Sequence, residues 1–529
     1  MKIFLRLLLF VVLIFPLCLP FLERGYFPTH DGEWAIIRLA EMHREVREGH
    51  IPPRWSSYLN HGYGYPLFLF TYPFPYYVGE VINIAGFNLV DSIKAVFILS
   101  IVLSGIGMWF LVSQLWGEKA AWVATALYLY APYRISNLYI RGSLGESLIL
   151  ALFPLLFLFF YKLKYSKNPA LIVINAVLIA VLIQTHNALS VLFLPFLGFW
   201  IAYLYRGVNK RFLVKSLMAG GLGFLLSIYF WLPVLFEKKF IQLAQNPLAN
   251  KYEHFLSISD LTSRSWDFSI QPPFQLGVVH IGLFILCCIS FLFFKKDLKT
   301  RLFFIGITLM SLFMVFSLSH VLWQLPVLKE IDFPWRMLGI SIFLLSLTGA
   351  VFIAQSKKTW LTVVTIIFII LSSISYIKTQ DRFEKEDGYY ETNDATTTSA
   401  DELMPIWFTL KSGQRPNKVL TVEDQDTQVN ILSNRTTFLR LNIDSTRIQT
   451  LTLNQAYFPG WKAQKNLDDV PIVADANGLV SMTIPEGVYN LTISFSKTPV
   501  RAVADSFSIV GVVIAASLWV YGKKLSVYS

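Results

Sequence analysis

The chain has 529 residues, of which 54% are hydrophobic and 16% aromatic, while only 15% are charged. About a quarter of the residues of soluble globular proteins are charged, so this composition excludes an ordinary soluble protein. The net charge of +11 does not call for a nucleic-acid partner, because the lysines and arginines of membrane proteins gather in cytoplasmic loops. The cysteines, Cys18, Cys287 and Cys288, lie in apolar runs and form no CxxC metal motif.

Repeated apolar runs predict a polytopic α-helical membrane protein. The first run, residues 7–22, is long for the core of a signal peptide, so we expect a retained first helix, with a cleaved signal as the alternative. We predict about 12 spans, at residues 3–22, 93–115, 118–135, 147–162, 169–184, 188–205, 212–236, 277–294, 302–319, 335–354, 359–378 and 504–522.

A further apolar run at residues 66–86 contains three prolines and Glu80. Proline costs a helix interior about 3 kcal/mol, and a glutamate in mid-membrane is also unfavourable. If this run does not cross the membrane, both chain termini and all basic connectors fall on the cytoplasmic side, as the positive-inside rule requires. The basic connectors lie at 161–168, 206–211, 295–301, 356–358 and 522–524. We therefore expect a juxtamembrane or re-entrant segment on the outer face of the plasma membrane. A count of 13 spans, with another short span lost, is the alternative.

The chain divides by composition into three parts. Residues 1–378 form the predicted membrane module, with a first exterior loop at 23–92, and 504–529 form the last helix and a cytoplasmic tail. Residues 379–503 are polar, and from about 417 they alternate with period two, as in "TTFLRLNIDS" and "GVYNLTISFS". With "ANG" and "PEG" as turn signals, this pattern predicts a small extracytoplasmic β-sandwich.

The stretch "FPTHDGEW" places His30, Asp31 and Glu33 directly after the first span. The residues that follow have apolar side chains at 36, 37, 39, 40, 42 and 46, which predicts an amphipathic helix in the plane of the membrane interface. Asp31 and Glu33 then cap this helix and compensate its dipole. Alternatively, Asp31 is a carboxylate partly shielded from water that accepts a proton from an acceptor hydroxyl.

Three later exterior loops carry further candidates. In "NLYIRGSLGESL", Arg141 and Glu146 pair with each other, or Arg141 holds an anion and Glu146 orients a sugar hydroxyl.

In "LIQTHNALS", His186 and Asn187 satisfy the backbone of a tight turn, or His186 binds a phosphate or sugar. In "EIDFPWRMLG", Asp332 and Arg336 begin a span, where Arg336 anchors the interface or clamps a lipid-linked phosphate.

Several catalytic motifs are missing from the sequence. There is no Walker A loop, no GxGxxG after a strand, no HExxH and no GxSxG. Nucleotide-driven transport and cytosolic nucleotide-sugar chemistry therefore have no support. We predict no metal site and no certain cofactor; a divalent metal is conceivable but unsupported.

The motifs "THDGEW", "RGSLGE", "THNALS", "FPWR" and "QAYFPGWKA", in this order, resemble the GT-C membrane glycosyltransferases. The likeness is closest to YfhO-type proteins and to the bacterial membrane proteins described as 6-pyruvoyl-tetrahydropterin synthase-related, a description that fits no pterin chemistry visible here. "QAYFPGWKA" looks like a fold signature of the C-terminal domain.

The resemblance implies sugar transfer from a polyprenyl-phosphate donor to an unknown glycan, teichoic acid, lipid or protein acceptor outside the cell. It also implies that Asp31 acts as the base or positions the acceptor. Protein mannosyltransferases have adjacent Asp and Glu residues, whereas Gly32 separates Asp31 from Glu33 here, which weakens the case for Glu33 as a catalytic residue. The competing hypotheses are a surface-polysaccharide polymerase or ligase, a flippase for a lipid-linked glycan, and a non-catalytic envelope protein.

Overall fold

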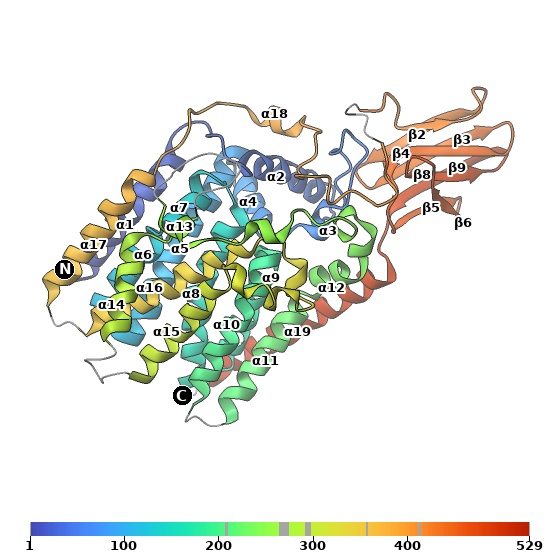
Figure 1. The fold of residues 1–529 in the computed structure, drawn as a ribbon. Helices are drawn as coiled ribbons and strands as arrows, with labels where there is room; N and C mark the ends of the chain where they lie inside the picture. Colours follow the sequence, from blue (N-terminus) through green and yellow to red (C-terminus); the bar gives the residue numbers. More distant parts are fainter. Residues whose placement is uncertain are drawn as a thin grey trace.

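The computed structural model describes residues 2–206, 210–263, 274–290, 298–355, 358–410, 413 and 415–527. A bundle of long helices makes up most of the molecule, and a β-domain projects from one end of it (Figure 1). The sequence predicts a polytopic helical protein with a small β-domain before its last helix, and this prediction is confirmed.

A helix lies within each of the twelve predicted spans, and residues 291–294 of the span predicted at 277–294 lie outside the described residues. The helices are α1 (Lys2–Leu22), α5 (Leu89–Trp116), α6 (Glu118–Leu129), α8 (Leu144–Tyr165), α9 (Ala170–Thr185), α10 (Asn187–Tyr205), α11 with α12 (Lys210–Leu226 and Ile228–Glu237), α14 (Val278–Ser290), α15 (Leu298–Phe313), α16 (Met337–Ala354), α17 (Thr359–Ser373) and α19 (Pro499–Val527). Within the described residues, seven of these are long and apolar enough to cross a membrane, or eight if the bent pair α11 and α12 forms one span. The other four, α6, α9, α14 and α15, have 12 to 16 residues, against about 20 for a full crossing.

Two predicted spans are interrupted by local backbone chemistry. The axis bends by 66° between α11 and α12, where the Ser227 hydroxyl donates to the carbonyl of Gly223 at 2.9 Å. Serine hydroxyls that bond back to the preceding turn bend helices. The span predicted at 118–135 ends early, because Pro132 forces Ala131 into an extended conformation and starts a separate helix, α7 (Pro132–Tyr139).

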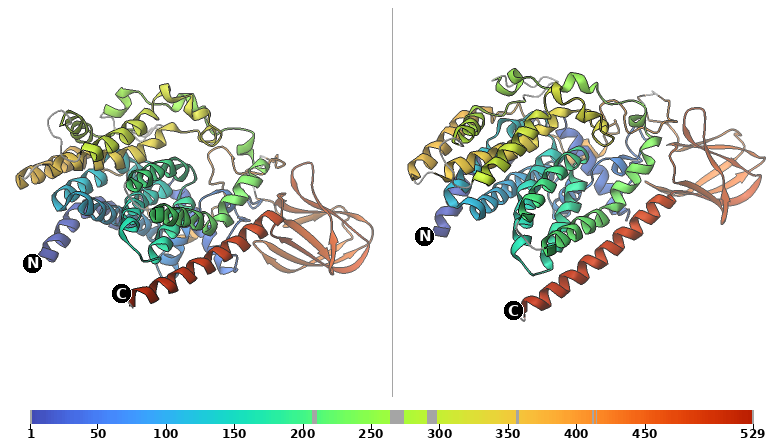
Figure 2. Two further views of the ribbon diagram at one scale, coloured as in Figure 1. Left: turned by 90° about the horizontal axis from the view of Figure 1, so that it is seen from below. Right: turned by 60° about the horizontal axis from the view of Figure 1, so that its bottom comes forward.

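The apolar run at 66–86 does not form a membrane-length helix. It folds as α3 (Leu67–Phe70) and α4 (Phe74–Ile84), of 4 and 11 residues. Val81 and Ile84 of α4 are 69% and 65% exposed, which suits contact with the membrane interface. Both chain termini lie at the end of the bundle opposite α2 and the β-domain (Figures 1 and 2), as the charge pattern predicts.

The amphipathic helix after Asp31 is α2 (Gly32–Arg47), and it is more enclosed than the sequence suggests. Most of its apolar residues are buried, but so are Glu41 and Glu45, at 2% and 0% exposure. Arg44 pairs with Glu41 at 2.6 Å, and His50 pairs with Glu45 at 2.9 Å. The predicted helix is present, and segments distant in the sequence cover its two carboxylates Glu41 and Glu45.

One covering segment is the chain between the membrane module and the β-domain, residues 378–410. It pairs with the first exterior loop through a bridge between Tyr26 and Phe383, and its short helix α18 (Asp387–Glu391) packs on α2. Arg38 of α2 donates to the hydroxyl of Thr397 at 3.1 Å. The remaining short elements are α13 (Ile258–Thr262) and the 3₁₀ turns η1 (Lys238–Phe240), η2 (Gln242–Ala244), η3 (Lys251–His254), η4 (Ser317–Ser319), η5 (Leu322–Gln324), η6 (Leu328–Glu330), η7 (Pro334–Arg336) and η8 (Ile374–Tyr376).

The predicted β-sandwich is present as two antiparallel sheets, ordered β1-β4-β8-β7 and β2-β3-β9-β5-β6. Both predicted turns lie between strands, and their glycines, Gly478 and Gly487, have positive φ. The strands are β1 (Leu420–Val422), β2 (Gln428–Arg435), β3 (Phe438–Ser445), β4 (Gln449–Ala456), β5 (Trp461–Lys465), β6 (Asp468–Val470), β7 (Ile472–Ala474), β8 (Leu479–Ile484) and β9 (Gly487–Phe495).

The motif "QAYFPGWKA" docks this β-domain onto the first exterior loop. The Gln455 side chain accepts from Trp55 Nε1 at 2.9 Å and donates to the carbonyls of Ser57 and Gly62. Arg501, at the start of α19, is buried and pairs with Glu237 at 2.8 Å. These contacts fix the β-domain at the end of the bundle that carries α2.

We predict that the β-domain lies outside the cell and that the C-terminal end of α8, at Tyr165, lies inside the cell. In a variant whose native cysteines are replaced by alanine, Leu467→Cys, at an 86% exposed position between β5 and β6, should react with a membrane-impermeant maleimide on intact cells. Tyr165→Cys, at a 66% exposed position, should react only after permeabilisation. The reverse labelling pattern would overturn the predicted orientation.

Glu41 generates a prediction about stability and pH. Burial raises its pKa from 4.5 to about 7, although Arg44 opposes the shift. The folded protein therefore keeps this proton where the unfolded chain has lost it, so the stabilisation is complete below pH 4.5 and disappears as pH rises through 7. The melting temperature of Glu41→Gln minus that of the wild type should increase from pH 5 to pH 8.

The exposed Glu386 provides the matched control, because Glu386→Gln should leave the pH profile of melting unchanged. Parallel profiles for wild type and Glu41→Gln would show that Glu41 is not protonated in the folded protein.

Candidate functional site

The candidate site is built around the buried carboxylate of Glu146, in the first turn of α8. Glu146 has no exposed surface. Arg141 binds the carboxylate with both Nη atoms, with Nη1 at 2.7 Å from Oε2 and Nη2 at 3.0 Å from Oε1. The Tyr133 hydroxyl donates to Oε2 at 3.1 Å. A fork of this kind combines charge with planar geometry, so Glu146 and Arg141 form one rigid unit.

Arg336 joins this unit from a different part of the chain, at the junction of η7 and α16. Its Nε lies 3.3 Å from Glu146 Oε1, an ion pair without hydrogen-bond alignment. The Trp335 ring lies beside both guanidinium groups, at 4.6 Å from Arg141 and 5.7 Å from Arg336. The Arg336 side chain remains 22% exposed, against 7% for Arg141, and no hydrogen bond from a described residue engages its Nη atoms.

His186 approaches the same carboxylate from the turn between α9 and α10. Its Nε2 lies 3.7 Å from Glu146 Oε1, and its Nδ1 accepts from the backbone N–H of Leu189 at 3.2 Å. Burial, reinforced by the Arg336 charge, lowers the pKa of His186 to about 3. His186 is therefore a neutral imidazole with its proton on Nε2, and it supplies no charge to a ligand near pH 7.

Two glycines of "RGSLGE" allow close approach of neighbouring segments. A Cβ on Gly145 would lie 2.5 Å from the ring of Tyr72, which stacks on His186 at 5.1 Å. Gly142 has φ +61°, and a Cβ there would lie 2.2 Å from Thr29 Oγ1. These positions bring the first exterior loop against the Arg141 loop.

Asp31 lies at that contact. Its backbone N–H donates to the carbonyl of Arg141 at 2.8 Å, and that of His30 donates to Ile140 at 3.0 Å. Asp31 occupies the N-cap position of α2 but makes no side-chain cap hydrogen bond. No hydrogen bond or ion pair from the described residues engages its half-buried carboxylate, which lies within electrostatic reach of Arg141 and Tyr72.

The other candidates have contacts elsewhere. Glu33 pairs with Lys385 at 3.2 Å, toward the covering segment, and His30 is exposed. The Asn187 amide donates to the carbonyl of Phe70 at 2.8 Å, which ties α10 to α3. Asp332 accepts from the backbone N–H of Leu248 at 3.2 Å. None of these four side chains contacts the Glu146 carboxylate.

The structure thus brings together Asp31, Arg141, Glu146, His186 and Arg336 from four separate stretches of sequence. Sequence reasoning missed Tyr72 and Tyr133, which complete the surroundings of Glu146 and His186. Both tyrosines lie in segments rich in aromatic residues, where an interface belt is the ordinary expectation. Among the described residues, no group of three or more His, Cys, Asp or Glu side chains is placed to hold a metal ion.

Known proteins similar to this chain include a 26% identical uncharacterized protein of Lactococcus lactis subsp. cremoris (strain MG1363), aligned over 336 residues. That match covers 60% of this chain and 52% of the relative, so it spans about half of the relative's length. The cryo-EM structure of arabinofuranosyltransferase AftD from Mycobacteria superposes with a TM-score of 0.48 at 13% identity, covering 70% of this chain and 26% of that one.

A family model described as "6-pyruvoyl-tetrahydropterin synthase related domain; membrane protein" matches residues 69–381. The match covers more than half of the chain and includes Arg141, Glu146, His186 and Arg336. The resemblance to this family that the sequence motifs indicate is therefore confirmed. The chain belongs to the family of 6-pyruvoyl-tetrahydropterin synthase-related membrane proteins.

Proposed function

We propose that this protein is a GT-C type glycosyltransferase that moves a sugar from a polyprenyl-phosphate donor to an acceptor on the extracytoplasmic face of the plasma membrane. The observation that carries the proposal is the free carboxylate of Asp31 beside a cluster of arginines. The acceptor oxygen attacks the anomeric carbon, the bond from that carbon to the phosphate oxygen breaks, and the polyprenyl phosphate leaves with the bonding electrons. One base and one displacement suffice, so the anomeric configuration is inverted.

Asp31 has the properties of the required base. A general base needs a carboxylate that is not already engaged and that a substrate hydroxyl can approach. Asp31 has no side-chain partner in the described chain and is half-buried, whereas Glu33 is paired with Lys385. We therefore assign proton removal from the acceptor to Asp31 and no direct part in the reaction to Glu33.

Arg336 is the better candidate for the donor phosphate. Arg141 is almost buried, and both of its Nη atoms are occupied by Glu146. Arg336 is three times as exposed, and its Nη atoms point to no partner among the described residues. A guanidinium with free Nη donors suits two phosphate oxygens and stabilises the charge that develops on the leaving group.

Glu146 is a positioning residue in this proposal. Because it is fully buried and surrounded by cations, its contacts favour the pairing alternative over direct contact with a sugar hydroxyl. Its negative charge offsets part of the repulsion between the guanidinium groups of Arg141 and Arg336, while His186 beside it is neutral.

The proposal predicts that Asp31→Asn abolishes sugar transfer while the protein still folds and inserts. Loss of the base should lower the rate by at least about 100-fold, measured with purified protein, polyprenyl-phosphate hexoses and membrane-extract acceptors. Glu33→Gln on the same helix is the matched control and should retain transfer. Normal turnover by Asp31→Asn would remove Asp31 as the base.

Substitution of Glu146 should lower the stability of the protein, whereas substitution of Arg336 should weaken donor binding. Glu146→Gln leaves Arg141 as an uncompensated buried cation, which costs roughly 3–5 kcal/mol, so melting temperature and yield should fall. Arg336→Gln leaves the pair of Arg141 and Glu146 intact, so it should melt near the wild type but show a raised KM for the donor.

The opposite pattern, with a stable Glu146→Gln variant and an unchanged donor KM in Arg336→Gln, would contradict these two roles.

A further inference from the structure

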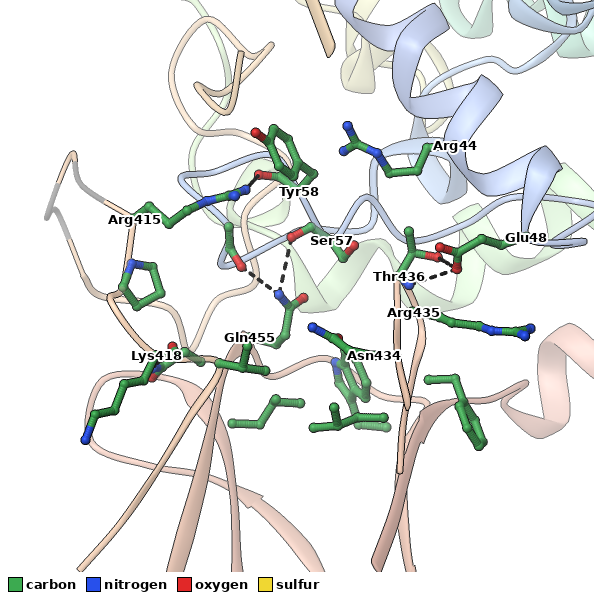
Figure 3. Close-up of a pocket in the computed structure, with 18 of the residues that line it drawn as sticks. Arg44, Glu48, Ser57, Tyr58, Arg415, Lys418, Asn434, Arg435, Thr436 and Gln455 are labelled. Atoms are coloured by element: carbon green, nitrogen blue, oxygen red, sulfur yellow. Dashed lines mark hydrogen bonds between the residues drawn. The ribbon is translucent and has the colours of Figure 1, made fainter. Parts of the chain in front are cut away.

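A pocket of about 360 Å³ lies between the membrane module and the β-domain (Figure 3). One wall is formed by the end of α2 and by residues 57–62 of the first exterior loop. The other is formed by the chain before β1, the hairpin of β2 and β3, the end of β4 and the start of β5. Its volume is typical of small-molecule ligand sites and is much larger than one phosphate group requires.

Positive charge dominates the lining of this pocket. Arg44, Arg415, Lys418 and Arg435 all contribute to it, against Glu48 as the only carboxylate among its described lining residues. The Glu48 carboxylate is already satisfied, because the backbone N–H and hydroxyl of Thr436 donate to its Oε2 at 2.9 and 2.7 Å. The pocket therefore presents a net positive surface to a ligand.

The four cations divide into two kinds. Arg44 pairs with Glu41 at 2.6 Å, and Arg415 lies 3.4 Å from Asp394 and donates to the carbonyl of Tyr58. Lys418 and Arg435 are exposed, and no hydrogen bond or ion pair from the described residues engages their side-chain charges. Arg44 and Arg415 therefore shape the pocket, whereas Lys418 and Arg435 are available to a ligand.

The pocket also offers neutral recognition groups. Trp461 lines it and is only 8% exposed, yet its indole Nε1 has no hydrogen-bond partner in the described structure. An unsatisfied buried donor is uncommon and costly, so a ligand acceptor oxygen would complete it. Arg44 and Arg415 lie 4.1 and 3.9 Å from the ring of Tyr58 and hold that side chain in place.

We infer that this pocket binds an anionic oligosaccharide, with Lys418 and Arg435 on its phosphate or carboxylate groups and Trp461 on a sugar oxygen. Its identification as the acceptor glycan rests on the proposed function. The pocket and Asp31 lie toward opposite ends of α2, since Arg44 follows Asp31 by thirteen positions, or roughly 20 Å along a helix axis. The pocket thus holds a part of the chain remote from the reacting hydroxyl.

The test measures binding to the full-length protein in nanodiscs of phosphatidylcholine by fluorescence anisotropy. The labelled probes are a poly(glycerol phosphate) oligomer, an oligogalacturonate, a neutral malto-oligosaccharide and a single-stranded DNA oligomer. The poly(glycerol phosphate) oligomer, the oligogalacturonate or both should bind, and the affinity should fall as the salt concentration rises. Binding of the first probe indicates recognition of phosphate groups, and binding of the second indicates recognition of carboxylate groups.

The double variant Lys418→Glu with Arg435→Glu should weaken that binding by at least about tenfold. Lys462→Glu, an exposed lysine of β5 outside the pocket, is the control and should bind as the wild type does. Equal binding of the neutral sugar or of DNA, or unchanged binding by the double variant, would overturn the inference.

Binding needs no donor and no transfer, so Asp31→Asn should bind the probe normally. The two failures are therefore distinguishable. If this inference fails, the protein transfers sugar but does not bind the probe. If the proposed function fails, the protein binds the probe but transfers no sugar.

Discussion

The arrangement of the exterior loops depends on one buried ionic interaction, the pair of Glu146 with Arg141, beside which Arg336 lies. A carboxylate without exposed surface is tolerated only when it is paired and hydrogen-bonded. Glu146 lies in the first turn of α8, and its partners are Arg141 in the loop before α8, Tyr133 on α7 and Arg336 at the start of α16. His186, in the turn between α9 and α10, lies against the same carboxylate. Because the Arg141 backbone also pairs with Asp31, the same interaction sets the position of the proposed base.

The second organising element is α2, which connects two regions of different chemistry. It begins at Asp31, beside the arginine cluster, and ends near the cationic pocket against the β-domain. The segment 378–410 and the β-domain cover the polar face of this helix, which explains why Glu41 and Glu45 are buried. The β-domain is therefore attached to the helix that carries the proposed base, and the proposed glycan pocket lies near the other end of the same helix.

The sequence predicted the parts of this structure that depend on local patterns. Hydropathy predicted twelve spans, and a helix lies within each of them. The prolines of 66–86 indicated a run that does not form a long helix, and the glycines of "ANG" and "PEG" marked real turns. Charge parity placed the Asp31, Arg141, His186 and Arg336 loops on one side, which is why these residues could be grouped before their contacts were known. The break at Ser227, the burial of α2 and the pocket at Trp461 were not predictable, because each depends on hydrogen bonds or packing between distant segments.

The central claim is that the polyprenyl phosphate of a donor binds at the Arg336 end of the cluster with its sugar facing Asp31. A cryo-EM structure with a non-transferable polyprenyl-phosphonate sugar tests this most directly. The account predicts phosphonate density against the guanidinium of Arg336 and the anomeric carbon on the side of Asp31, with the lipid tail leaving between helices. Phosphonate density at the opposite end of the bundle, or a sugar out of reach of Asp31, would contradict it.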